Sequence, residues 1–264
     1  MPFIVIGGGS NLLVSDNGID GIVIRYYSDV PRIEPRSRLL RVTAGTLLDE
    51  VVSFCAEQGL AGMNFLTGIY GTVGGAIVGN AGAFGRQISE CLSSVDVTDT
   101  AGHSQILSPD QLDFGYRDSA FKHNDMIVLE AVFSLNQGDR SQLLKERNEL
   151  LALRKEKHPD LKRLPSAGSF FKNISPEGNQ QNRQAVGWFL EQAGVRNLRV
   201  NGAAVFEKHA NMIVKESECC AQDVFNLSRM MAQRVKKSFG LDLSREVRLV
   251  GYFEGDHPSA PWVR

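Results

Sequence analysis

Residues 3–14 read FIVIGGGSNLLV, a short apolar run that leads directly into three consecutive glycines. An apolar strand that ends in glycines brings backbone N–H groups against a phosphate in many nucleotide-binding folds. A Rossmann fingerprint, G-x-G-x-x-G, opens a helix, whereas here Leu12 takes the third glycine position. The Asn17-Gly18 turn and the β-branched run 22–24 predict a hairpin rather than a helix. The stretch argues against a Rossmann fold and leaves open a phosphate-cradling loop of another kind or a tight glycine turn.

The composition bounds the class of protein. The chain has 264 residues, of which 42% are hydrophobic, and a formal net charge of -1. It is long enough for one large domain or two smaller ones, and it lacks the basic field of a nucleic-acid binder. No apolar run reaches the length of a membrane span, and the first 25 residues lack a signal-peptide layout. The four cysteines form no C-x-x-C pair, which indicates reduced thiols in a cytoplasmic protein without a metal.

Alternating and helical patterns predict the elements of the first half. Leu48, Val51 and Cys55 recur at helical spacing within residues 47–58, with Thr46 and Asp49 as a capping pair and Gly59 as the terminator. Strands are expected at residues 38–45, 93–102 and 126–135.

The densest glycine region lies at residues 66–85, LTGIYGTVGGAIVGNAGAFG, where seven of twenty residues are glycine. It has too few side chains for an ordinary helix interior and too little polarity for a linker. We interpret it as backbone that lies close to a flat or phosphorylated ligand. The alternative is a set of tight turns between small buried helices.

The second half begins with the charged helix expected at residues 141–159, which Pro159 ends. We place the domain boundary there and predict domains at residues 1–140 and 141–251, followed by a tail at 252–264. Further elements are expected at 185–194 (helix), 202–215, 221–239 (helix ending at Gly240) and 245–253 (strand).

Six stretches come in an order that is typical of one family. The stretches are GGGSNLL (7–13), GTVGGAIVGNAGAFG (71–85), YRDSAFK (116–122), SAGSFFKN (166–173), NGAAVFEKHANMIV (201–214) and REVRLVG (245–251). With them the chain resembles the UDP-N-acetylenolpyruvoylglucosamine reductases (MurB), and the resemblance covers nearly the whole chain, from residue 3 to about 251.

The resemblance implies an α+β flavoprotein. It would have a two-subdomain FAD-binding domain of the PCMH/MurB type and a C-terminal α+β substrate-binding domain. The implied oxidoreductase activity reduces the enolpyruvyl ether of UDP-N-acetylglucosamine to UDP-N-acetylmuramate, with hydride from NADPH passed through FAD. This places the chain in peptidoglycan precursor synthesis, hence in cell wall biogenesis, cell shape and cell division. A cytoplasmic monomer with a UDP-sugar substrate is expected.

The resemblance also assigns FAD-binding residues. The first glycine stretch matches the family's diphosphate loop, and the second matches the wall along the flavin and its ribityl chain. The residues are Gly7, Gly8, Gly9, Ser10, Asn11, Gly71, Thr72, Val73, Gly74, Gly75, Asn80, Ala81 and Gly82.

Three residues match the family's catalytic positions, and their types suit the chemistry. Hydride addition to the enolpyruvyl group leaves negative charge on its carboxylate, which the guanidinium of Arg117 can bind bidentately. Ser169 matches the proton donor, and Glu246 matches the acidic partner that hydrogen-bonds the intermediate. Without the resemblance, Arg117 could form a turn ion pair with Asp118, Ser169 could be a turn residue, and Glu246 could lie on an exposed strand edge.

Four further residues match family positions near the substrate. Asn173 and His209 fall where the family contacts the substrate, and Tyr116 and Lys122 flank Arg117 and are expected to hold it. A satisfied core histidine is the alternative for His209.

The chain departs from the family pattern at two places. Tyr70 stands where the family usually has a proline, which fixes the turn before the flavin wall. A βαβ-type unit generally precedes the glycine loop and is expected to be missing here. An incomplete gene model, a shortened form that binds FAD weakly and a fold completed by another partner would each explain this. We favour the first because the catalytic matches are kept.

Two other functions stay open at this stage. The first is a shortened flavin- or nucleotide-binding protein without reductase activity. The presence or absence of bound flavin would distinguish it from the reductase. The second is an FAD-dependent oxidase of another small molecule, whose turnover would not need Ser169 or Arg117.

Overall fold

A computed structural model describes residues 2–175 and 183–256 of the chain. The described residues form two compact units. The first unit contains residues 2–9 and 21–154, and the second contains 10–20, 155–175 and 183–256. Each unit has its own hydrophobic core.

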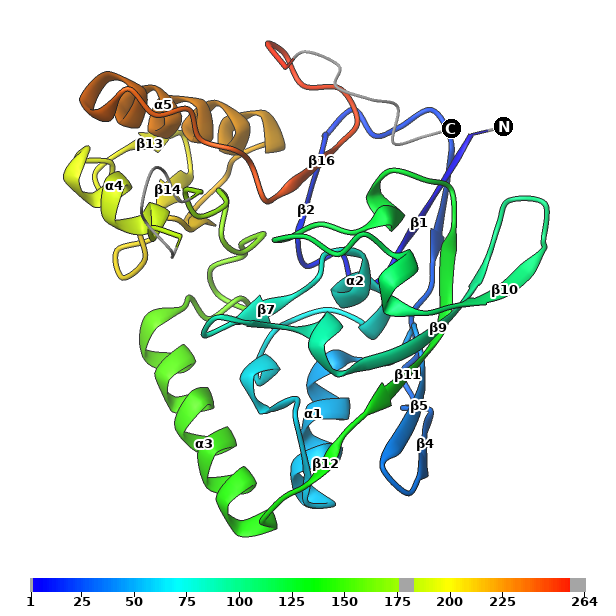
Figure 1. Cartoon of the computed structure of the whole chain (residues 1–264). Helices are drawn as coiled ribbons and strands as arrows, with labels where there is room; N and C mark the ends of the chain where they lie inside the picture. The colour runs from blue at the N-terminus through cyan, green and yellow to red at the C-terminus, as the bar shows by residue number, and fades with distance from the viewer. Residues whose placement is uncertain (1, 176–182, 257–264) are drawn as a thin grey trace. The chain divides into compact units, whose positions relative to one another are not determined.

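The first unit is built around a five-stranded antiparallel sheet with the strand order β10-β9-β11-β5-β4 (Figure 1). The strands predicted at 38–45, 93–102 and 126–135 are confirmed. Side chains alternate along them, so Leu40 and Val42 enter the core while Arg41 faces outward to Asp96 and Glu130 at 2.9 and 2.7 Å. The bounds are Ile33–Arg36 (β4), Leu39–Thr43 (β5), Leu92–Thr98 (β9), Ser104–Leu107 (β10) and Ile127–Ser134 (β11).

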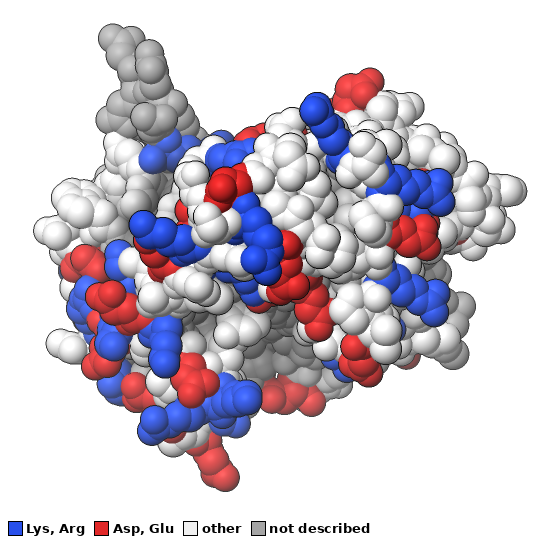
Figure 2. All heavy atoms as spheres, turned by 90° about the horizontal axis from the view of Figure 1, so that it is seen from below, with Lys and Arg blue, Asp and Glu red and all other residues white. Residues whose placement is uncertain are grey.

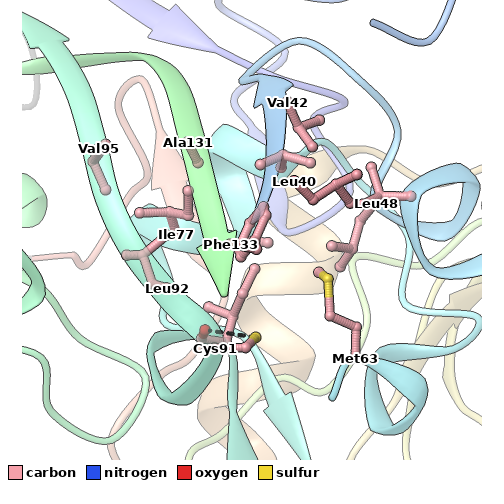
Figure 3. Packing of buried hydrophobic residues seen from close by; sticks show 14 of the residues in the cluster. Leu40, Val42, Leu48, Met63, Ile77, Cys91, Leu92, Val95, Ala131 and Phe133 are labelled. Atoms are coloured by element: carbon pink, nitrogen blue, oxygen red, sulfur yellow. Dashed lines mark hydrogen bonds between the residues drawn. The ribbon is translucent and has the colours of Figure 1, made fainter. Parts of the chain in front are cut away.

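The core of the first unit lies between this sheet and the helices α1 (Leu48–Glu57) and α2 (Val73–Val78). Figure 3 shows Phe133 and Leu40 from the sheet among side chains from these helices and from Met63. Cys91 lies in the same cluster, where burial raises the pKa of its thiol to about 12. This cysteine is therefore a protonated core residue at neutral pH.

The predicted capping pair of α1 is wrong. Leu47 takes the N-cap position, and the Leu48 N–H donates to the Gly71 carbonyl at 3.0 Å. Because the glycine-rich segment supplies this acceptor, Thr46 is not needed as a cap, and its hydroxyl instead pairs with that of Thr43 at 2.9 Å. The predicted terminator is confirmed, since Gly59 follows the helix with φ +68.

Helix α3 (Arg140–Lys157) matches the helix predicted at 141–159. The compact units divide inside its last turn, because contacts hold the earlier turns to the first unit. Asn64 donates to the Leu143 carbonyl at 3.0 Å, and Arg147 forms a bidentate pair with Asp49 at 2.8 and 2.7 Å. The boundary therefore follows side-chain contacts that no local pattern reveals.

Replacing Asp49 by Asn is expected to lower the free energy of unfolding by roughly 1–2 kcal/mol near neutral pH. Burial alone raises the pKa of Asp49, but hydrogen bonds from Arg147 and Gly68 outweigh it, so the pKa lies below its ordinary value. This stabilisation is present above a pH of about 4 and is lost as the pH falls through the depressed pKa. Urea unfolding near pH 7 and near pH 3 measures the effect.

Glu149→Gln is the control for this comparison, because Glu149 is exposed and lies 4.0 Å from Lys145. This substitution is expected to change the free energy of unfolding by less than about 0.5 kcal/mol. A destabilisation of Asp49→Asn that is equal at both pH values would contradict the ion-pair assignment.

The opening strand is confirmed as β1 (Phe3–Ile6), but the predicted hairpin is wrong. β1 pairs in parallel with β3 (Ile22–Arg25). The intervening β2 (Leu12–Val14) pairs instead with β16 (Arg248–Val250) in the second unit. The two short parallel pairs replace the hairpin because Leu13 packs against the core of the second unit.

The second unit packs helices α4 (Val186–Gln192) and α5 (Ala221–Phe239) against the three-stranded sheet β13-β14-β15 (Figure 1). Both predicted helices are confirmed. α5 ends at Gly240 with φ +73, and Leu227, Met231 and Val235 are buried along its inner face. The strand bounds are Arg199–Val200 (β13), Ala203–Val205 (β14) and Ile213–Lys215 (β15).

The described part of the predicted tail packs on the second unit. Phe253 is buried with its ring 5.4 Å from that of Phe225, and Asp256 pairs with Arg245 at 2.9 Å. Residues 257–264 lie outside the described residues. Short elements complete the fold: β6 (Leu60–Ala61), β7 (Gly82–Ala83), β8 (Arg86–Gln87), β12 (Asn136–Gln137) and 3-10 turns at Asn64–Leu66, Ile88–Cys91, Pro109–Gln111 and Ala120–Lys122.

Two surface observations bear on function. On the face shown in Figure 2, basic and acidic side chains are interspersed rather than gathered by sign. In the part of the chain that the structure describes, no helix is long and apolar enough to cross a membrane, and no cluster of His, Cys, Asp and Glu could hold a metal ion.

Candidate active site

The two glycine stretches meet in the first unit. A Cβ on Gly7 would lie 2.1 Å from the Thr72 hydroxyl, and one on Gly8 would lie 3.3 Å from the Cα of Gly71. Thr72 is the N-cap of α2, and its hydroxyl accepts from the Gly75 N–H at 3.3 Å. The close approach explains why Gly7 and Gly8 carry no side chain, and it joins segments about 65 positions apart in the chain into one backbone surface.

The second glycine stretch is held by the loop at residues 115–122. Asn80 is fully buried in a left-handed conformation (φ +42), and its amide donates to the Gly115 carbonyl at 2.8 Å. Ser119 donates to the Val78 carbonyl at 2.8 Å, and Arg117 donates to the Gly82 carbonyl at 2.5 Å. Three hydrogen bonds therefore couple Arg117 and its loop to the predicted flavin wall.

Arg117 itself lies on a strained turn. Its φ is +55, in the left-handed region that costs an L-residue about 1–3 kcal/mol. The guanidinium lies over the Tyr116 ring at 5.1 Å, and the Lys122 ammonium donates to the Arg117 carbonyl at 2.6 Å. The carboxylate of Asp118, the next residue, lies 3.0 Å from the Nε2 atom of His123.

In the second unit, Ser169 and Glu246 lie on neighbouring extended segments. Ser169 forms a β-bridge with Met212, and the Glu246 N–H donates to the carbonyl of Phe170 at 2.8 Å. Gly168, with φ +85, makes the turn that leads into Ser169, and no neighbouring described atom lies within 4 Å of where its Cβ would be. The segments that carry these two predicted catalytic residues are therefore neighbours in the second unit, although no sequence spacing connects them.

Asn11, at the C-terminal end of the first glycine stretch, belongs to the second unit, which also contains Ser169 and Glu246. The Asn11 amide donates to the Ala167 carbonyl at 3.1 Å, and the Asn11 carbonyl accepts from the Arg248 N–H at 3.1 Å. Asn11 therefore joins the segment of Ser169 to the strand that follows Glu246.

Comparison with known proteins agrees with this geometry. Residues 158–250 match the family model of the UDP-N-acetylenolpyruvoylglucosamine reductase C-terminal domain, and residues 1–108 match an FAD binding domain. The chain is 38% identical over 251 residues to the UDP-N-acetylenolpyruvoylglucosamine reductase of Clostridium botulinum (strain Alaska E43 / Type E3). That match covers 95% of the chain and 79% of the relative. The Lactobacillus acidophilus reductase is 36% identical, with 95% and 81% covered.

The chain belongs to the UDP-N-acetylenolpyruvoylglucosamine reductase family. Its fold also matches the crystal structure of the Thermus caldophilus family member, with a TM-score of 0.78 and 33% identity over 95% of this chain and 86% of that one. The predicted family and fold class are confirmed.

The first unit fits the FAD of this family. Gly9 has φ +69, and no neighbouring described atom lies within 4 Å of where its Cβ would be, so the backbone is open at that point. Gly7 and Gly8 bring this open turn against Thr72. A glycine turn of this kind presents backbone N–H groups to phosphate oxygens. The predicted FAD residues within 7–11 and 71–82 remain the candidates to hold the cofactor.

The Tyr70 departure does not remove the turn before the flavin wall. Leu47 forms a β-bridge with Thr72, and the Gly71 carbonyl accepts from Leu48. This backbone pairing holds the turn that a proline usually fixes in the family. Tyr70 is 66% exposed, so its ring does not fill the core.

The two other predicted substrate contacts, Asn173 and His209, lie in the second unit. The Asn173 side chain accepts from the Val186 N–H at 3.1 Å and thereby caps the start of α4. His209 lies in the turn between β14 and β15, with its ring 5.7 Å from that of His158. Burial lowers the pKa of His209, so its imidazole is neutral at pH 7. Their contact with substrate stays a prediction.

Asn211 is a positioning residue that the sequence motifs did not predict. It is 3% exposed, and its side chain accepts from the Phe171 N–H at 2.9 Å and donates to the Phe171 carbonyl at 2.8 Å. These two bonds hold the segment that carries Ser169. The signal was present in the sequence, since the single amide inside the apolar run ANMIV (210–214) needs internal partners when buried.

Replacing Asn211 by Ala is expected to destabilise the protein by about 1–3 kcal/mol for each Phe171 group left unpaired. Urea unfolding followed by circular dichroism measures the change. Asn226→Ala is the control, because Asn226 accepts one bond from Gln222 on the partly exposed face of α5 and its loss is expected to be within about 0.5 kcal/mol. Equal effects of the two substitutions would contradict the role of Asn211.

Proposed function

We propose that the chain reduces UDP-N-acetylglucosamine enolpyruvate to UDP-N-acetylmuramate with NADPH, through bound FAD. One hydride and one proton add across the enolpyruvyl double bond, and NADPH becomes NADP⁺. The observation that supports the proposal is the pairing of the segment of Ser169 with the segment of Glu246 in the second unit, through the Glu246 N–H and the Phe170 carbonyl. Family membership supports the substrate class.

FAD, held by the predicted residues within 7–11 and 71–82, would supply a hydride carrier between NADPH and the substrate. The residues of the chain do the remaining work. Arg117 binds the substrate carboxylate and stabilises the negative charge that hydride addition places on it, because a guanidinium fork matches a carboxylate in geometry and charge. The bonds from Lys122 and to Gly82 fix its position before substrate arrives.

Ser169 donates its hydroxyl proton to the carbon that bears the carboxylate. A hydroxyl is a weak acid, but this carbon is strongly basic once hydride has been added. Glu246, in its protonated form, donates a hydrogen bond to the charged intermediate. Tyr116, Asn173 and His209 are proposed to contact or orient the UDP-sugar.

The finer assignments follow from this activity. We propose NADPH as the reductant and a cytoplasmic monomer as the working form, with a role in peptidoglycan synthesis and so in cell shape and division. The interspersed charges of Figure 2 fit a small-molecule substrate better than a nucleic acid.

The test is a product assay with the full chain, FAD, NADPH and the enolpyruvyl substrate. The expected result is NADPH oxidation that depends on the substrate, with a product heavier than the substrate by two hydrogens. NADPH oxidation that proceeds equally without substrate, with no reduced product, would instead indicate an oxidase.

A further inference from the structure

Arg248 on β16 is a partly buried cation without an anionic partner. No ion pair or side-chain hydrogen bond joins its guanidinium to another residue in the described ranges 2–175 and 183–256, and burial alone lowers its pKa. Two other partly buried arginines each have a carboxylate partner: Arg147 pairs with Asp49, and Arg245 pairs with Asp256. Arg154 is also desolvated, but the negative charge of Asp49 attracts its guanidinium and raises its pKa in opposition to burial.

A desolvated charge is costly unless an opposite charge or several hydrogen bonds compensate it. A guanidinium binds phosphate and carboxylate oxygens with two parallel N–H bonds, and it keeps its charge where a lysine would lose its proton. The unpaired state of Arg248 therefore indicates an anion that comes from outside the chain.

The position of Arg248 indicates which anion. Its N–H donates to the Asn11 carbonyl at 3.1 Å, and Arg248 lies opposite Leu12 in the parallel β2–β16 register. Ser10, Asn11 and Arg248 all belong to the second unit. Ser10 and Asn11 end the stretch that resembles the family's diphosphate loop.

We propose that Arg248 is a further cofactor-binding residue, whose guanidinium carries the countercharge for the diphosphate of FAD beside Ser10 and Asn11. This inference rests on the FAD dependence of the proposed function. Ser10 and Asn11 carry no formal charge, whereas a diphosphate carries two negative charges that a guanidinium can balance. The β2–β16 pair thereby links cofactor binding to the strand that follows Glu246.

The test compares FAD and riboflavin binding to the flavin-free full chain by quenching of flavin fluorescence. Riboflavin has the same ring system but no phosphate. Arg248→Gln is expected to raise the Kd for FAD about 10- to 100-fold while the Kd for riboflavin changes less than about 2-fold. Arg248→Lys is expected to fall between, since it keeps the charge but loses the fork.

Arg245→Gln is the matched control, because it removes a charge from the same segment that already has Asp256 as partner. Its FAD affinity is expected to stay within about 2-fold of the parent. Circular dichroism of each variant checks folding, and Arg248→Lys keeps the test decisive if the glutamine variant does not fold.

Two results would overturn the inference. One is an unchanged FAD affinity in folded Arg248→Gln or Arg248→Lys. The other is an equal loss of FAD and riboflavin affinity, which would place the guanidinium against the flavin ring. A parent chain that binds FAD but does not reduce the enolpyruvyl ether would contradict the proposed function alone, because the binding measurement needs no substrate.

Discussion

Replacing Ser169 by Ala is expected to lower kcat about 10²- to 10⁴-fold, the range for loss of a positioned proton donor. The methyl group fits the same space, and the β-bridge to Met212 uses only the backbone. FAD binding and the reduction of FAD by NADPH are therefore expected to remain at the parent level. Rapid-mixing spectroscopy measures the two half-reactions separately and locates the defect in the second one.

Ser244→Ala is the control for this substitution. Ser244 is exposed on the neighbouring segment, and its carbonyl, not its hydroxyl, accepts from Lys172. Its kcat is expected to stay within about 2-fold of the parent. A Ser169→Ala enzyme with a parent-like second half-reaction would show that another group delivers the proton.

Replacing Arg117 by Gln is expected to lower kcat/KM for the enolpyruvyl substrate about 10²- to 10³-fold, as for loss of one partner of a buried charged pair. Glutamine has a similar reach and suffers the same strain at φ +55, so the turn itself is expected to persist. Arg117→Lys is expected to recover part of the loss through its charge. Steady-state kinetics at saturating NADPH measures both variants.

Arg86→Gln is the control, because Arg86 lies on the neighbouring β7–β8 hairpin and pairs with Glu90 at 3.0 Å. Its kcat/KM is expected to stay within about 3-fold of the parent. If Arg117→Gln changes kcat/KM no more than this control does, the carboxylate of the substrate must be bound elsewhere.

Local patterns predicted those elements whose partners are also local. Helix α5 follows from its apolar stripe and Gly240, and the sheet strands follow from their alternation. The hairpin after β1 was wrong because the partner of β2 is β16, at the other end of the chain. The cap of α1 was wrong because its acceptor is the distant Gly71 carbonyl.

The candidate site shows the same limit. Arg117, Ser169 and Glu246 could be named only through the family resemblance, since no spacing rule connects them. Asn211 and Arg248 were not predicted because their roles depend on burial and on partners that are present or absent in the folded unit. The position of Asn211 inside an apolar run indicates that its amide needs partners but not which ones, and an isolated Arg carries no sign of burial or of a missing partner.

The most direct test of the account is an anaerobic visible spectrum of the FAD-loaded full chain through two additions. The account predicts that NADPH bleaches the flavin band and that UDP-N-acetylglucosamine enolpyruvate then restores it without oxygen. Restoration only after oxygen is admitted would contradict the reductase assignment.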